Sequence, residues 1–244
     1  REASTVTLRL ITAGALLTLV GVALAVKVFL GESWSLSFLV GALLVATGPT
    51  VITPILEVVP VREHVASALE AEGVINDVSA AIAAVVIFEV FVEHDGTLLE
   101  GLVTFLSRFG IGIAAGIVSA GIVYVVLVRD LAPGNSPQVS RFLFVSAALG
   151  AFAMAEAVAA EAGIAAAATS GILLGNAPLP HRETMEEFGR DVTLLVLAFV
   201  FISLAAFIKP DAIRQLGLSG VALVVAVVLV IRPLAVFVGT VGVE

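Results

Sequence analysis

Cysteine is absent from the 244 residues, so disulfides, thiol chemistry and thiolate metal sites are excluded. Charge is also scarce: only 13% of the residues are Asp, Glu, Lys or Arg, and only Lys27 and Lys209 are lysines. Acidic residues outnumber basic ones, 20 to 12, which gives a net charge of −8. Because nucleic-acid-binding proteins need a basic surface, this balance argues against a nucleic-acid partner.

Apolar residues dominate the chain: 60% are hydrophobic, and the mean hydropathy is +1.16. The apolar segments are apolar all round, whereas a helix of a soluble protein is apolar on one face only. Most are long enough to cross a bilayer, which takes about 20 residues. The sequence therefore predicts an all-α polytopic membrane protein. The eight segments are Leu8–Leu30, Leu36–Val59, Val65–Val92, Leu98–Val128, Phe142–Ala160, Ile164–Asn176, Phe188–Ile208 and Leu218–Val241.

The connections between these segments are short and carry Pro, Gly and charged residues. If all eight segments cross the bilayer, most arginines fall on one side, and Lys and Arg gather on the cytoplasmic side of membrane proteins. We therefore expect a cytoplasmic N-terminus, although Lys209 and Arg214 fall on the outer side. The histidines, His64, His94 and His181, lie in connections, where an interfacial role is favoured.

The second segment contains a run of Thr, Gly and Pro residues at membrane depth. Pro49 and Pro54 each lack an amide donor and clash with the preceding helical turn, and Gly48 precedes the first of them. One interpretation is a simple proline kink. The other is an unwound stretch whose freed carbonyls face a polar cavity together with the hydroxyls of Thr47 and Thr50, as in the ion sites of transporters. The segment alone does not decide between these interpretations.

The third and last segments carry polar residues deep within apolar runs. Glu72 and Asn76 are four residues apart and share a helix face, and Asp77 follows about 100° further round. A carboxylate at the bilayer centre costs at least about 2.5 kcal/mol, so Asp77 is a candidate functional residue. In the last segment, Arg232 precedes Pro233. A buried arginine needs a carboxylate or backbone carbonyls as partners, and we expect Arg232 to pair with Glu72.

The fourth segment carries small or medium residues at intervals of four: Gly112, Gly116, Ala120 and Tyr124. Rows of small residues allow two membrane helices to approach closely. The row fits packing inside one subunit or a dimer face.

Three motifs on separate segments carry a resemblance to a known family. "TGPT" (Thr47–Thr50), "EGVIND" (Glu72–Asp77) and "IRPLAVF" (Ile231–Phe237) resemble, in this order, motifs of the monovalent cation:proton antiporters, the sodium/proton exchanger family. The runs "SGILLGN" (Ser170–Asn176) and "RDVTLLVLAFVFISLAA" (Arg190–Ala206) are also similar to members of that family. The resemblance covers essentially the whole chain.

The resemblance implies an inverted-repeat antiporter fold with a broken transmembrane helix, a core domain and a dimerisation domain. Since the chain begins at Arg1 rather than Met and ends at Glu244 straight after an apolar run, we expect residues 1–244 to be a partial membrane transport domain that lacks helices at both ends. The expected protein is a multi-pass homodimer of the plasma membrane.

The resemblance also implies roles for individual residues. Asp77 would bind either Na⁺ or a proton, and Asn76 fills the position that is asparagine in the electroneutral branch of the family. Thr47 would offer hydroxyl or carbonyl oxygen, and Glu72 would pair with Arg232 to hold the core together.

The chain departs from the family at the helix break formed by Gly48, Pro49, Thr50 and Pro54, because many relatives have aspartate at the position of Gly48. The departure leaves open whether the cation is Na⁺, K⁺ or Li⁺.

The expected activity is exchange of one monovalent cation for one proton, with Na⁺ favoured and no organic cofactor. A carboxylate that holds a proton or a cation, but not both, couples the two flows when access alternates between the two sides of the bilayer. A cation channel and a structural membrane protein are alternatives. An intramembrane aspartyl protease is a further alternative, but it needs two facing aspartates, and apart from Asp77 only Asp191 lies within a predicted span, near its start. No enzymatic activity is expected.

Overall fold

The computed structural model describes residues 7–48, 56, 58–59, 61, 63–93, 96–129 and 136–240, without the side chains of residues 63–64 and 212–213. This part of the chain is helical and contains no strand. Three short π-helical stretches, labelled η, interrupt or extend the α-helices. The elements are η1 (Leu10–Gly14), α2 (Ala15–Leu30), α3 (Trp34–Val45), α5 (Glu63–Ile87), η2 (Phe88–Glu93), α6 (Leu98–Val128), α7 (Pro137–Glu156), α8 (Ala162–Asn176), α9 (Arg182–Phe207), α10 (Pro210–Ala226), η3 (Val227–Ile231) and α11 (Arg232–Thr240).

Each of the eight apolar segments of the sequence corresponds to a helix or a run of consecutive helices. Within the described residues, six helical runs are long and apolar enough to cross a membrane, and Trp34–Val45 and Ala162–Asn176 are shorter apolar helices. The prediction of an all-α polytopic membrane protein is confirmed. The six long runs are Thr7–Leu30, Val65–Glu93, Leu98–Val128, Pro137–Glu156, Arg182–Phe207 and Arg214–Thr240.

The chain divides into two compact units. Unit 1 consists of Arg1–Phe105 and Gln215–Glu244, and unit 2 consists of Leu106–Arg214. Unit 1 therefore combines helices from both ends of the chain, and every polar residue singled out in the second, third and last segments belongs to it.

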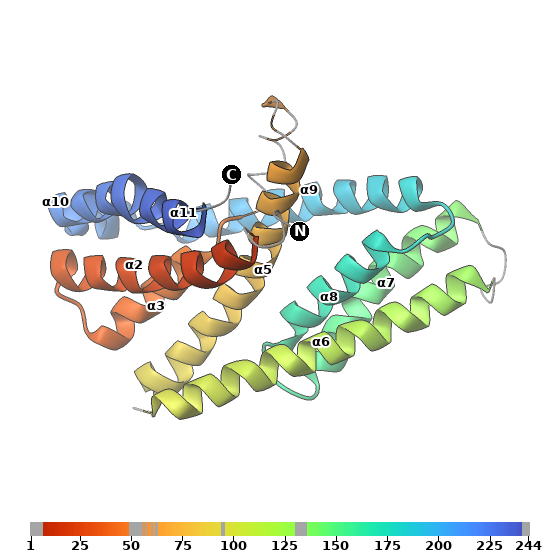
Figure 1. The fold of residues 1–244 in the computed structure, drawn as a ribbon, viewed down its shortest axis with the longest axis horizontal. Helices are drawn as coiled ribbons and strands as arrows, with labels where there is room; N and C mark the ends of the chain where they lie inside the picture. The colour runs from red at the N-terminus through yellow and green to blue at the C-terminus, as the bar shows by residue number, and fades with distance from the viewer. Residues whose placement is uncertain are drawn as a thin grey trace. The chain divides into compact units, whose positions relative to one another are not determined.

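In unit 1, α2 and α3 pack side by side along most of their length (Figure 1). The approach is close because Gly41 has no side chain: a Cβ there would lie 2.5 Å from the carbonyl oxygen of Leu19. The run η3–α11 covers the other side of α2, where Ile231 joins Val22 and Val26 in a buried apolar cluster. Helix α5 packs against α3, so the polar residues of α5 lie on a helix that contacts the end of α3.

Helix α3 ends at Val45, well short of Val59, where the apolar segment of the sequence ends. The backbone then leaves the helical region at Ala46 (φ −53°, ψ 131°) and reaches a left-handed conformation at Gly48 (φ 62°). The expected helix break therefore begins before the first proline. Pro49, Thr50 and Pro54, the other expected members of the break, lie outside the described residues.

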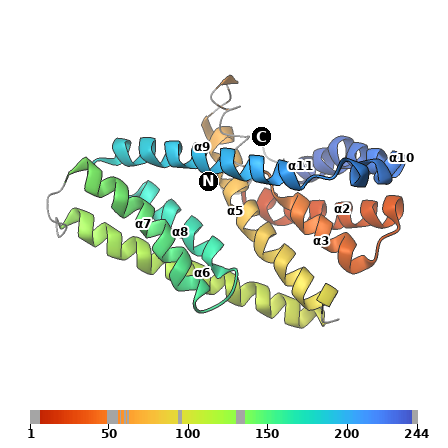
Figure 2. The same ribbon diagram turned by 180° about the vertical axis from the view of Figure 1, so that it is seen from behind.

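In unit 2, α7 and α8 lie side by side (Figure 2), and the row of small residues in α6 faces α8. A Cβ added to Gly112 would lie 2.5 Å from the carbonyl oxygen of Ala162, and one added to Gly116 would lie 2.6 Å from that of Ala166. These two glycines therefore serve packing inside one subunit, the first of the two interpretations left open by the sequence.

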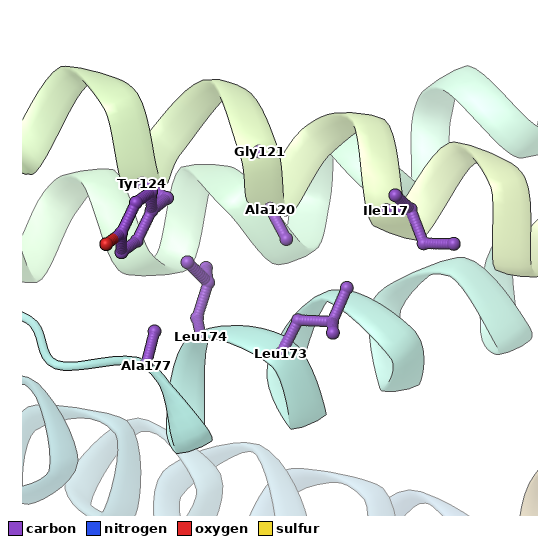
Figure 3. A pocket seen from close by; sticks show the side chains of 7 residues that line it. All are labelled: Ile117, Ala120, Gly121, Tyr124, Leu173, Leu174 and Ala177. Carbon is purple, nitrogen blue, oxygen red and sulfur yellow. The ribbon is translucent and has the colours of Figure 1, made fainter.

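A small apolar cavity of about 230 Å³ lies between α6 and α8 in unit 2 (Figure 3). Tyr124 and Ala177 lie at one end and Ile117 at the other. None of the lining residues is charged. The lining residues are Ile117, Ala120, Gly121, Tyr124, Leu173, Leu174 and Ala177.

Candidate functional site

Helix α5 carries the three polar residues singled out in the sequence, Glu72, Asn76 and Asp77, within a largely apolar run. Asn76 is almost completely buried, with 2% of its surface exposed, while Glu72 and Asp77 are partly buried. The i, i+4 spacing brings Glu72 and Asn76 together, and the Asn76 side-chain amide donates a hydrogen bond to Glu72 Oε1 at 2.7 Å. The shared helix face predicted from the spacing is confirmed by this contact.

Asp77 contacts the break at the end of α3. Its Oδ1 atom accepts hydrogen bonds from the backbone amides of Thr47 at 3.0 Å and Gly48 at 3.1 Å. These amides are available because the chain has already left the helix, so no carbonyl of a preceding turn binds them. These hydrogen bonds hold one oxygen of the Asp77 carboxylate against the break. The break and the intramembrane aspartate, two separate features of the sequence, therefore form one structure.

Two further oxygen atoms at this site are buried and have no hydrogen-bond partner among the described residues: Thr47 Oγ1 and Asn76 Oδ1. Buried polar atoms almost always have a partner, so each oxygen calls for an explanation such as water or an ion. One belongs to a residue whose amide binds Asp77, and the other belongs to the residue before Asp77. The site thus offers carboxylate, hydroxyl and amide oxygens, the ligand types that hard cations prefer.

Arg232 binds the same break from the other end of the chain. Its Nη2 atom donates hydrogen bonds to the carbonyl oxygens of Leu44 and of Ala46, the latter at 3.0 Å. The expected ion pair with Glu72 is not among the ion pairs within 4.0 Å that the described residues form. The pair therefore stays a prediction. Backbone carbonyls, the other partners open to a buried arginine, bind the guanidinium.

The sequence did not identify the backbone groups of this site. It singled out Thr47 for its oxygens and Gly48 as a break, but their amides hold the carboxylate of Asp77. Backbone carbonyls were one of the two kinds of partner considered for Arg232, but the carbonyls of Leu44 and Ala46 were not singled out. The available signal was the Thr-Gly-Pro run, which predicts freed backbone groups without saying what they bind.

Transition-metal chemistry finds no support in the described residues. No group of three or more His, Cys, Asp or Glu side chains gathers there in a way that could hold such a metal ion. Asp77 contributes one carboxylate to the site, and a second, that of Glu72, is hydrogen-bonded to Asn76.

Comparisons with known proteins point the same way. Residues 1–243 match the family model described as "Sodium/hydrogen exchanger, transmembrane". The Na(+)/H(+) antiporter ApNhaP of Aphanothece halophytica is 26% identical over 234 residues, which cover 92% of this chain and 43% of the relative.

Of two other relatives, one is named for K⁺ and one for Na⁺. The K(+)/H(+) antiporter NhaP2 of Shewanella sp. (strain ANA-3) is 27% identical over 207 residues, which cover 84% of this chain and 35% of the relative. The Na(+)/H(+) antiporter 1 of Methanocaldococcus jannaschii is 26% identical over 211 residues, which cover 84% of this chain and 49% of the relative. The chain thus spans less than half the length of each of these three relatives.

The family match extends over nearly the whole chain, so it includes residues of both units and the residues around Asp77. This family consists of transporters and not of enzymes, which removes the intramembrane protease from the alternatives. The chain is a multi-pass membrane protein and belongs to the sodium/hydrogen exchanger family of cation/proton antiporters.

Proposed function

We propose that this chain forms the ion-binding part of a secondary transporter that exchanges a monovalent cation for H⁺ across the plasma membrane. Na⁺ is the favoured cation, with K⁺ and Li⁺ as alternatives, and Asp77 binds the cation and the proton in turn. The observation that carries the proposal is the contact of Asp77 with the helix break, where two backbone amides bind a single carboxylate oxygen.

This contact supports the proposal because the two amides engage only one of the two carboxylate oxygens of Asp77. Both amides bind Oδ1, and no described residue donates a hydrogen bond to Oδ2. A carboxylate fixed by one oxygen can present the other to a cation or to a proton without losing its position. Thr47 Oγ1 and Asn76 Oδ1 are the neutral oxygens that we propose as further cation ligands.

Competition for Asp77 couples the two flows. A proton on the carboxylate removes the charge that attracts the cation, and a bound cation disfavours the proton. When access to the site alternates between the two sides of the membrane, one cation crosses for each proton. The exchange is then electroneutral, since one positive charge moves in each direction.

The family names favour a transporter over a channel, and the names of the relatives include both Na⁺ and K⁺. The cation is therefore an open choice that the assay must include. The homodimer predicted from the resemblance is part of the proposal, with a second copy of this chain as partner.

The test is reconstitution of the full-length protein in liposomes that contain a pH-sensitive dye. A cation gradient of Na⁺, K⁺ or Li⁺ is applied in turn, and proton movement is recorded for the wild type and for Asp77→Asn. The substitution suits the test because the asparagine oxygen can still accept the hydrogen bonds from Thr47 and Gly48, so the fold is expected to persist.

We expect Asp77→Asn to abolish cation-driven proton movement while the protein remains monodisperse in detergent. Full activity in a folded Asp77→Asn protein would overturn the proposal. A wild-type exchange rate that changes with membrane voltage, as a net movement of charge requires, would overturn the electroneutral stoichiometry and leave the role of Asp77 intact.

A further inference from the structure

The turn between α2 and α3 brings a charged side chain and aromatic rings together at one end of unit 1. Gly31 caps the end of α2, and Ser33 caps the start of α3, which begins at Trp34. Lys27 lies in the last turn of α2. Its ammonium group donates a hydrogen bond to the backbone carbonyl of Glu32 at 2.8 Å and lies 5.7 Å from the centre of the Trp34 ring. The side chain of Lys27 therefore reaches across the turn.

This turn lies at the boundary of the membrane. The helical run Thr7–Leu30 is long and apolar enough to cross a bilayer, and the turn follows its last residue directly. Only three residues, 31–33, separate α2 from the apolar helix α3, so the turn cannot extend far from the lipid surface. A lysine at the end of a membrane helix places its charged group at the level of the lipid headgroups.

Trp34 suits the same level of the bilayer. Its side chain is 51% exposed, although its ring contacts that of Phe38, with the ring centres 6.0 Å apart. Tryptophan is enriched at membrane interfaces because its large ring is apolar while its indole N–H is a hydrogen-bond donor. Val28 and Phe29, which follow Lys27 in the last turn of α2, are exposed apolar residues. The turn therefore offers both polar and apolar groups to lipid.

The polar groups of the turn can still bind a ligand. An ammonium group has three N–H donors, and the carbonyl of Glu32 takes one from Lys27. Within the described part of the chain, the indole N–H of Trp34 and the carboxylate of Glu32 take part in no hydrogen bond. The turn thus presents two kinds of donor, which suit a phosphate, and one carboxylate, which suits an ammonium group.

The charges of the turn select among lipid headgroups. Lys27 and Glu32 are the only charged residues between Leu10 and Val45, so the turn carries one charge of each sign. A phosphate bound to Lys27 lies near the carboxylate of Glu32, and an ammonium group on the same headgroup offsets their repulsion. A primary ammonium group can also donate a hydrogen bond to the carboxylate, whereas the quaternary group of phosphatidylcholine has no N–H. Phosphatidylglycerol has no ammonium group at all.

We propose that the α2–α3 turn is a binding site for the headgroup of phosphatidylethanolamine. Lys27 and the indole N–H of Trp34 bind the phosphate, the carboxylate of Glu32 binds the ammonium group, and the Trp34 ring lies against the upper part of the acyl chains. The lipid thereby anchors this end of the hairpin formed by α2 and α3 at the membrane surface. The inference is independent of the role proposed for Asp77.

The fluorescence of Trp34, the only tryptophan of the chain, supplies the test. The full-length protein is reconstituted in phosphatidylcholine vesicles that contain increasing fractions of a lipid with bromine atoms on its acyl chains near the headgroup, because bromine quenches tryptophan on contact. The brominated lipid is phosphatidylethanolamine, phosphatidylcholine or phosphatidylglycerol in turn. The signal of Trp34→Phe is subtracted from that of each protein, so that any tryptophan elsewhere in the full-length protein cancels.

We expect half-maximal quenching at about a threefold lower fraction of phosphatidylethanolamine than of either other lipid, the effect of one exposed ion pair. Glu32→Gln should abolish this preference and improve quenching by phosphatidylglycerol, because it removes the repulsion of the phosphate. Lys27→Met should weaken the binding of phosphatidylethanolamine about threefold. Lys209→Met is the control: it replaces the other lysine of the chain, which is exposed between α9 and α10, and should leave all three quenching curves unchanged.

Equal quenching by the three lipids in the wild type would overturn the inference, because it would show contact with bulk lipid only. A preference for phosphatidylglycerol, or no quenching at all, would overturn it as well. If Lys27→Met does not fold, Glu32→Gln decides, since this variant keeps the backbone carbonyl that binds Lys27. An unchanged preference for phosphatidylethanolamine in Glu32→Gln would then refute the site. Quenching does not depend on transport, so the outcome for Asp77→Asn does not affect this test.

Discussion

Gly48 is the position where a single methyl group should weaken the site without adding charge. Its φ angle of 62° lies in the left-handed region, which glycine adopts freely and which costs other residues about 1–2 kcal/mol. Gly48→Ala either bears this strain or shifts the backbone and loses the hydrogen bond from its amide to Asp77. Because a hydrogen bond to a charged group contributes about 1.5–3 kcal/mol, both routes weaken the binding-competent site by a similar amount. At about 1.4 kcal/mol for each factor of ten, the cation KM should rise about 5- to 30-fold.

The assay is cation-driven proton movement in liposomes, with KM and kcat determined separately. Gly31→Ala is the matched control, because Gly31 also has a left-handed backbone (φ 72°) and a Cβ there would meet nothing within 4 Å. It caps the end of α2, away from the contact with Asp77. Gly48→Asn is the second comparison, since asparagine tolerates the left-handed region better than alanine.

We expect Gly31→Ala to lower the melting temperature as much as Gly48→Ala does, with no change in KM. Gly48→Asn should recover part of the affinity that Gly48→Ala loses. An unchanged KM in a folded Gly48→Ala protein would show that the amide of Gly48 does not position Asp77 and would refute the reasoning. Equal changes of KM in Gly48→Ala and Gly31→Ala would also refute the reasoning. They would show that backbone strain at any left-handed glycine raises KM, whether or not its amide binds Asp77.

Three further substitutions test other contacts. Asn76→Ala removes both the hydrogen bond to Glu72 and Oδ1, which has no hydrogen-bond partner among the described residues. The loss of about 1–2 kcal/mol of binding free energy should raise the cation KM about tenfold. An unchanged KM would exclude Asn76 as a ligand. Gly112→Ala should lower the stability of the protein in detergent by about 1–3 kcal/mol, because its methyl group would meet a carbonyl oxygen of α8 at 2.5 Å. Gly121→Ala is the control on the same helix. Its methyl group meets open space, so the melting temperature should stay unchanged or rise. Glu156→Ala should cost about 1 kcal/mol of stability, because the Glu156 carboxylate accepts hydrogen bonds from two backbone amides at the start of α8; an unchanged melting temperature would show that this cap contributes nothing.

The helices of this protein could be predicted from hydropathy, because long apolar runs in a membrane have few alternatives to the helix. One of the eight apolar segments is an exception. The apolar segment Leu36–Val59 extends beyond α3, which ends at Val45, because hydropathy does not register where the helical hydrogen bonds stop. Pro49 and Pro54 predict a break in this helix, but α3 ends before both of them.

The side chains of the candidate site could also be predicted, since Asp77 and Arg232 are costly in an apolar run and so stand out. Their partners could not. The spacing of Glu72 and Asn76 predicts their contact because both residues lie on one helix. The partners of Arg232 lie more than 180 residues away along the chain and are backbone carbonyls, which look the same at every position of a sequence.

The two amides that hold Asp77 also bear on how this site can evolve. Every amino acid except proline carries a backbone N–H, so the donor at position 47 survives any replacement of Thr47 other than proline. Drift of the side chains around the break therefore leaves the carboxylate anchored, and a new residue there can alter the choice of cation while the anchor remains. The backbone amides that hold Asp77 are thus independent of the side chains at these positions, which are free to change.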